Sequence, residues 1–181
     1  MNEVYERRIR TKKLAMASCL VALSVTIMYI GTVISFLDLT MIAIASVPVY
    51  FAVIEMGSYY PIMLYAATSV LSLLLLPDKF SAVVYIAFGG LYPILKEKLE
   101  KLKEPFCTLL KFADFTVAAA LIMIVSIFVL TPNQTEGYLY YAAVVVLEYI
   151  AFFIYDFAMT KLISLYINKL RALTGMDKFF K

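Results

Sequence analysis

The chain has 181 residues, of which 64% are hydrophobic and 16% charged, and its mean hydropathy is +0.89. Soluble domains are typically nearer half apolar and a quarter charged, so this chain is too hydrophobic to hide its apolar residues in one core. It has no histidine and only two cysteines, which excludes the common zinc and haem ligand sets and any histidine-based triad. The composition therefore indicates a polytopic membrane protein with no metal or other cofactor.

About six apolar segments follow one another, each roughly 17 to 25 residues long and therefore able to cross a bilayer. We expect them at about 14–35, 39–56, 59–76, 80 onward, 105–130 and 138 onward. Pro48 interrupts the second segment, and Gly89-Gly90 with Pro93 interrupts the fourth, because proline removes a backbone hydrogen bond. Broken helices often line the binding sites of transporters, although membrane helices tolerate proline generally. The sequence predicts a single all-α integral membrane domain, a six-helix bundle over residues 1–181.

Lysine and arginine gather on one predicted side of the membrane. They occur in an N-terminal tail (1–13), in a connection between the fourth and fifth segments (96–104) and in a C-terminal tail (169–181). On the opposite side, only Lys79 is basic. Because cytoplasmic loops carry an excess of these residues, we expect a multi-pass protein of the cell (plasma) membrane with both termini in the cytoplasm.

Glu148 is the most unusual residue of the apolar segments. It lies about ten residues from the outer start of the sixth segment, hence ~15 Å deep and near the bilayer midplane. A charge at that depth costs on the order of 2.5–3.5 kcal/mol by insertion scales. Helical spacing places Glu148 on one stripe with Tyr141, Val145, Phe152 and Tyr155. Three interpretations remain open: a ligand contact, a protonatable coupling group, or a neutral carboxyl that hydrogen-bonds to a neighbouring helix.

Asp156 and Lys161 lie further along the same segment and approach its inner end. We expect them to anchor the helix at the interface, where Lys161 extends toward the headgroups. Thr160, four residues after Asp156, is better placed to contact it than Lys161 at five. Asp114 in the fifth segment is the more credible buried carboxyl.

Small residues recur at a spacing of four in the first segment, at Ala15 and Cys19 and again at Ser18, Ala22 and Thr26. Such a face lets two helix backbones approach closely. Packing inside this bundle and docking of a separate membrane partner both remain open.

Several activities are excluded by missing motifs. The chain has no Walker-type phosphate loop, no H-E-x-x-H and no G-x-S-x-G. Nucleic-acid binding is not expected, because there is no soluble basic domain. Among carboxylates deep in the apolar segments, only Asp114 and Glu148 are available as a catalytic pair, so we expect a protein that is not an enzyme.

The overall plan resembles the substrate-binding S component of energy-coupling factor (ECF) transporters, and also small membrane proteins of Firmicutes. The similarity rests on about six short helices, on the basic lead-in Arg10-Thr11-Lys12-Lys13-Leu14-Ala15 to a first helix with small-residue spacing, and on the stretch from Asp156 to Ile163. The A-x-x-x-A pattern of the family is replaced here by Ala15-x-x-x-Cys19 and Ser18-x-x-x-Ala22.

The resemblance implies a subunit that captures a small planar, vitamin-like ligand on the outer side of the bilayer. It also implies docking through the first helix onto a transmembrane T component driven by two cytosolic ATPases. By this analogy the ligand-binding residues are Tyr85, Asn133, Gln134, Tyr141 and Glu148. The partner-docking residues are Ala15, Ser18 and Ala22.

A second hypothesis is a non-transporting membrane scaffold of cell-envelope or morphogenesis machinery. It would contact its partners through the charged stretch 96–103 and have no ligand pocket. A polar cavity open to the outside beside the sixth segment would favour the importer subunit over the scaffold.

Overall fold

The computed structural model describes residues 2–34, 37–57, 59–101, 106–125 and 138–171. Of these residues 94% are helical, and no strand occurs among them. The expectation of an all-helical protein is thus confirmed. The predicted ligand contacts Asn133 and Gln134 lie outside the described residues.

The helices follow the predicted order of apolar segments. The first segment is α1 (Asn2–Val33), which begins at Asn2 rather than near Leu14. The others are α2 (Asp38–Ala45), α3 (Val47–Met56), α4 (Tyr59–Leu75), α5 (Lys79–Val84), the π-helical turn η2 (Tyr85–Gly89), α6 (Leu91–Leu99), α7 (Phe106–Val125), α8 (Tyr138–Leu165) and the π-helical turn η4 (Tyr166–Leu170). Both predicted interruptions are present: α2 gives way to α3 at Ser46, next to Pro48, and the helix after Lys79 is broken at η2.

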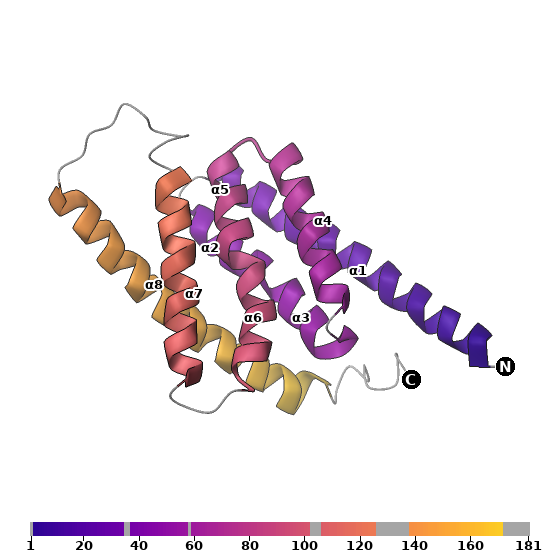
Figure 1. The fold of residues 1–181 in the computed structure, drawn as a ribbon. Helices are drawn as coiled ribbons and strands as arrows, with labels where there is room; N and C mark the ends of the chain where they lie inside the picture. The colour runs from indigo at the N-terminus through magenta and orange to yellow at the C-terminus, as the bar shows by residue number, and fades with distance from the viewer. Residues whose placement is uncertain (1, 35–36, 58, 102–105, 126–137, 172–181) are drawn as a thin grey trace.

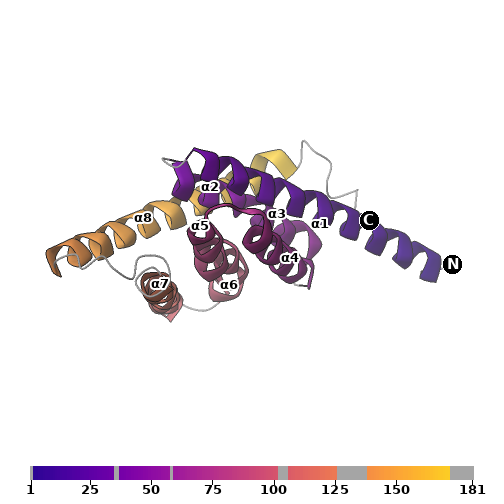
Figure 2. The same cartoon turned by 90° about the horizontal axis from the view of Figure 1, so that it is seen from above.

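The helices form two layers. In Figure 1, α4, the rod made of α5, η2 and α6, and α7 stand roughly parallel, and α1 and α8 cross behind them obliquely. Figure 2 shows the same three rods nearly end on, with the N-terminal end of α1 and the first half of α8 reaching beyond the bundle on opposite sides.

Four helical stretches are long and apolar enough to cross a membrane: Val4–Val33, Asp38–Met56, Phe106–Val125 and Ala143–Lys169. Tyr59–Leu75 is apolar but shorter. In α7 and α8 only 11% of the most apolar window is buried. Apolar surface on this scale needs a cover such as lipid or another membrane protein.

The main core lies between α1, the α2–α3 pair, α4 and the start of the interrupted helix. Met28, Val49, Leu64 and Ala82 are at most 1% exposed within it. Gly31 allows α1 to approach α2, because a Cβ at this position would lie 2.7 Å from the Cβ of Met41.

A second, aromatic core joins α8 to α6 and α7. Phe115 and Phe152 stack with ring centroids 4.4 Å apart, and Phe88 of η2 stacks on Tyr92 at 5.0 Å. Aromatic pairs of this kind contribute ~0.5–1.5 kcal/mol each beyond their buried area. They hold the middle of α8 against the bundle, next to the polar groups described below.

Candidate functional site

The interrupted helix carries the most irregular backbone near the centre of the bundle. At η2 the amide of Gly90 donates to the carbonyl of Tyr85, five residues back, at 2.8 Å. The hydroxyl of Tyr65 on α4 donates to the carbonyl of Ile86 within the same turn at 2.9 Å. Single π-helical turns are frequent at functional sites, so this turn is where a binding site is most expected.

Gly90 makes this turn possible. A Cβ at Gly90 would lie 2.6 Å from the ring of Tyr65 and 2.8 Å from the ring of Tyr85. Only a residue without a side chain lets both rings pack on the backbone here. Upstream, Asp78 caps the start of α5 by accepting a hydrogen bond from the amide of Phe80 at 3.1 Å.

Tyr85, a predicted ligand-binding residue, is completely buried, and its hydroxyl makes no hydrogen bond of good geometry to a described residue. The hydroxyls of Thr68 and Ser69 on α4 are likewise buried without a partner in the described structure. The hydroxyls of Thr68 and Ser24 lie near that of Tyr85. Buried hydroxyls are nearly always paired, so this cluster has unused hydrogen-bonding capacity for an uncharged polar group.

A second row of hydroxyls continues toward α8. Tyr155 and Ser46, at the junction of α2 and α3, are joined through their hydroxyl oxygens at 2.7 Å. Tyr50 lies beside Tyr155, and its buried hydroxyl has no hydrogen bond of good geometry with a described residue. The interior polar groups therefore extend from η2 to the middle of α8.

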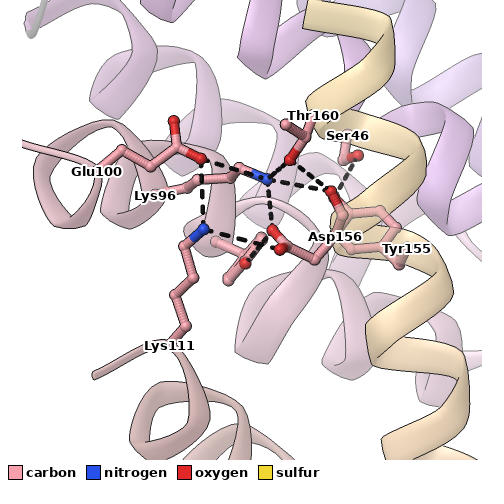
Figure 3. Close-up of polar contacts among 8 residues, drawn as sticks. Ser46, Lys96, Glu100, Lys111, Tyr155, Asp156 and Thr160 are labelled. Atoms are coloured by element: carbon pink, nitrogen blue, oxygen red, sulfur yellow. Dashed lines mark hydrogen bonds and ion pairs between the residues drawn. The ribbon is translucent and has the colours of Figure 1, made fainter. Parts of the chain in front are cut away.

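The row ends in a buried ion pair that the sequence did not predict (Figure 3). The ammonium group of Lys96, on α6, is 1% exposed and contacts the carboxylate of Asp156 on α8. Lys96 also donates to the hydroxyl of Thr160 at 2.6 Å, and Tyr92 donates to the same Asp156 oxygen at 2.6 Å. A buried charge is tolerated only when it is paired and hydrogen-bonded, and Lys96 meets both conditions.

Lys111 of α7 and Glu100 complete the network. Lys111 lies 3.3 Å from a carboxylate oxygen of Glu100 and 3.7 Å from the second oxygen of Asp156. Lys96 lies 3.6 Å from Glu100. With two lysines and two carboxylates the network is electrically neutral, and it connects three helices through their charges.

These contacts give Asp156 and Lys96 partners that local spacing did not predict. Asp156 is the acceptor at the centre of the network, and Lys96, at the start of the predicted connection 96–104, is buried on the packed face of α6. Lys161 lies instead over the ring of Phe157, 5.5 Å from its centroid. A sequence pattern could have indicated this network, because Tyr92, Lys96 and Glu100 are spaced four residues apart and so share one face of the helix.

Glu148 lies where α8 leaves the bundle. Phe152, one turn further along, is 4% exposed, whereas Val145, one turn before, is 37% exposed. Glu148 itself is half-buried and makes no hydrogen bond or ion pair with a described residue. The same holds for half-buried Asp114, so no bond joins these two carboxyls or links Glu148 to Tyr85. Tyr141 lies in the first turn of α8, on the helix of Glu148.

The predicted docking face of α1 is open. Ala15, Ser18, Cys19 and Ala22 are all exposed in the described structure, and the Ser18 hydroxyl bonds only within its own helix, to the carbonyl of Leu14 at 3.1 Å. The small-residue spacing therefore does not serve packing against the described helices. Of the two interpretations of this face, docking of a separate membrane partner remains open.

Two open surface depressions lie away from these groups. One is lined by Val4, Arg7, Arg8, Thr11 and Lys12, and the other by Phe106, Thr108, Leu109 and Phe112. Neither contains a predicted ligand contact. Among the described residues, no three histidine, cysteine or acidic side chains are grouped as metal ligands.

Comparisons with known proteins do not assign the chain to a group. No protein-family model, no curated protein and no solved structure matches it. The candidate site consists of two groups of residues. The η2 hydroxyl cluster is formed by Tyr85, Thr68, Ser69 and Ser24, and the neighbouring ion-pair network by Lys96, Asp156, Lys111 and Glu100.

Proposed function

We propose that this chain is the membrane-embedded substrate-binding subunit of a micronutrient importer. The observation that carries the proposal is the Tyr85 hydroxyl, which is fully buried at a π-helical turn among other hydroxyls and has no hydrogen bond of good geometry to a described residue. An uncharged hydroxyl with free hydrogen-bonding capacity can both donate and accept. Such groups favour a neutral, vitamin-like solute that carries its own donors and acceptors. Binding at this position requires the helices around η2 to separate, because the Tyr85 side chain is completely buried.

The exposed small-residue face of α1 supports the second half of the proposal. Ala15, Ser18 and Ala22 let another helix approach the α1 backbone closely. An importer subunit without a nucleotide-binding motif needs partners that supply energy. We assign this face to a transmembrane partner coupled to cytosolic ATPases.

In the membrane, we propose six crossings with both termini in the cytoplasm. The basic residues of α1 and of the α6 end then lie on the cytoplasmic side, in agreement with the usual distribution of lysine and arginine. The network of Lys96 and Asp156 lies toward that same side, and η2 lies nearer the middle of the bilayer.

The test is thermal unfolding of the purified full-length protein across a panel of vitamins and related small solutes, comparing the wild type with Tyr85→Phe. A ligand at a hundredfold excess over its Kd stabilises the wild type by ~2.7 kcal/mol. Tyr85→Phe removes only an unsatisfied hydroxyl, so the ligand-free stability changes by less than about 1 kcal/mol. The ligand-induced shift is expected to disappear in the variant.

Tyr29→Phe is the matched control, because Tyr29 on α1 is 49% exposed and is not one of the buried hydroxyl residues near Tyr85. It should retain the full ligand shift. If no compound stabilises the wild type, or if Tyr85→Phe retains the shift, the proposed binding site is wrong.

A membrane scaffold is the second candidate, and one observation favours it. α7 and α8 leave most of their apolar surface uncovered, as a protein that works through partner helices requires. Co-purification from mild detergent separates the two functions. ATPase subunits support the importer, and envelope-synthesis proteins support the scaffold.

A further inference from the structure

The Tyr85 hydroxyl is surrounded by side chains from three other helices. Thr68 of α4, Ser24 of α1 and Tyr155 of α8 all lie near it. Tyr155 also packs against η2 itself, with its ring centroid 5.2 Å from that of Phe88. Because the Tyr85 side chain is completely buried, a solute can reach it only if a surrounding helix moves.

The packing of α1 and α4 opposes such a movement. Both helices belong to the main core, where Met28 of α1 is 0% exposed and Leu64 of α4 is 1% exposed. Ser24 of α1 also donates a buried hydrogen bond to the carbonyl of Ala45 on α2 at 3.1 Å. Separating these helices would open a close-packed interior, which is costly. Among the described residues, none of α8 belongs to that core.

Ion pairs anchor α8 at one end only. From Asp156 onward, the rod of α8 and η4 is joined to other helices by the pair of Asp156 with Lys96, and by Arg171, which lies 3.0 Å from Glu55 of α3. The side chain of Glu55 is 3% exposed, so its charge needs this partner. Before Asp156, the one charged residue of α8 is Glu148, which makes no ion pair with a described residue.

The part of α8 before Asp156 is held to the α2–α3 junction by the hydrogen bond between the hydroxyls of Tyr155 and Ser46, which are 2.7 Å apart (Figure 3). Its ring contacts in the aromatic core are apolar and not directional, so they can slide without leaving a polar group unpaired. We propose that Tyr155 is the gate residue of the η2 hydroxyl cluster. Its bond to Ser46 keeps the cluster closed, and α8 opens it by turning about the anchored end at Asp156. The gate rests on the proposed function, because it controls access to the ligand site at Tyr85.

The experiment measures how fast a thiol inside the η2 hydroxyl cluster reacts in the ligand-free protein. Thr68→Cys is introduced into the full-length chain in a background without Cys19 and Cys107, and its alkylation by iodoacetamide in detergent is followed by mass spectrometry. Thr68 is completely buried, so the thiol reacts only when the surrounding helices open. Adding Tyr155→Phe should raise the rate roughly fivefold, the factor that corresponds to one ordinary hydrogen bond.

Tyr166→Phe is the matched control. It also removes a tyrosine hydroxyl that bonds to α3, at 3.2 Å from Glu55, but it lies on the anchored side of Asp156. Its labelling rate should stay within about twofold of the parent protein. Thermal unfolding of both variants measures the stability that each loses. Ser69→Cys, at the neighbouring buried hydroxyl, is the second reporter if Thr68→Cys does not fold.

Two results would overturn the proposal. An unchanged rate in Tyr155→Phe means that its bond to Ser46 does not control access, and an equal acceleration in Tyr166→Phe means that the whole bundle loosens. The vitamin panel tests the ligand site separately, because the labelling needs no ligand. If no solute stabilises the protein while Tyr155→Phe alone accelerates labelling, the ligand site is wrong and the movement of α8 stands.

Discussion

Tyr92 on α6 donates a 2.6 Å hydrogen bond to the carboxylate oxygen of Asp156 that Lys96 also contacts, although the two residues are 64 positions apart in the chain. This arrangement fixes α8 against α6 near the end of the bundle. The aromatic rings of Tyr92 and Phe152 pack beside it with their centroids 5.6 Å apart. The ion pair and the aromatic core therefore act as one helix junction.

Asp156→Asn should destabilise the protein by about 3 kcal/mol, because it leaves the ammonium group of Lys96 buried without its main counter-charge. Equilibrium unfolding in detergent measures this. Lys96→Met/Asp156→Leu should recover most of the loss, since an apolar pair can replace a buried ion pair.

Lys98→Met is the control for this pair, because Lys98 lies on the same helix and is exposed. Its stability should stay within about 0.5 kcal/mol of the wild type. An Asp156→Asn protein as stable as this control would show that the network does not hold the helices together.

Gly90→Ala should lower the stability by about 1–3 kcal/mol, since the added methyl would lie 2.6 Å from the ring of Tyr65. The η2 turn would have to move, so thermal unfolding and any ligand shift should both change. Gly57→Ala is the comparison variant. Gly57 has φ +83° and open space around it, so an alanine there strains the backbone without crowding a neighbouring side chain. A Gly90→Ala protein of wild-type stability would contradict the close packing at η2.

Tyr155→Phe and Ser46→Ala each remove one side of the 2.7 Å hydrogen bond between α8 and the α2–α3 junction. Each should cost about 1 kcal/mol in unfolding free energy. The double variant should cost clearly less than the sum, because both changes break the same bond. Additive losses in this double-mutant cycle would mean that the two hydroxyls are not coupled.

Glu148→Gln should leave the stability within about 1 kcal/mol of the wild type, because Glu148 has no hydrogen bond or ion pair among the described residues. This contrasts with Asp156→Asn in the same unfolding assay. If the loss exceeds 2 kcal/mol, Glu148 is a structural carboxyl bonded to a neighbouring helix rather than a group held for a ligand.

The proposed topology predicts different labelling of two introduced cysteines in a background without Cys19 and Cys107. With both termini in the cytoplasm, Lys98→Cys should be protected from a membrane-impermeant maleimide in intact cells and labelled after lysis. Gln134→Cys, in the predicted outer loop, should react in intact cells. The reverse pattern would invert the orientation.

The positions of the helices could be predicted from the sequence because each depends on a local property. Long apolar runs, Pro48 and the Gly89-Gly90 pair mark the helices and their interruptions without reference to other parts of the chain. Tyr85 was predicted as a ligand contact only through the resemblance to the ECF S component, not from a local property of the sequence. The small-residue spacing of α1 was also evident from the sequence. Whether another helix covers that face could not be predicted from it.

The partners of the charged residues could not be predicted from local sequence properties. Asp156 and Lys161 are five residues apart in one helix, and local spacing alone offers Thr160 as the nearest contact. The structure gives Asp156 a lysine from α6 and another from α7. Glu148, the residue that hydropathy made most prominent, lies at the edge of the bundle, whereas the buried ion pair formed around residues that looked peripheral.

The sequence by itself determined that this chain is helical and too apolar for water, because backbone hydrogen bonding and hydropathy act within a single segment. Only the tertiary structure decided that Lys96 is buried and that the Tyr85 hydroxyl faces an unsatisfied polar interior. Those outcomes depend on which helices cross, and at what angle, and the energy of a buried charge is set by neighbours that are distant in the chain.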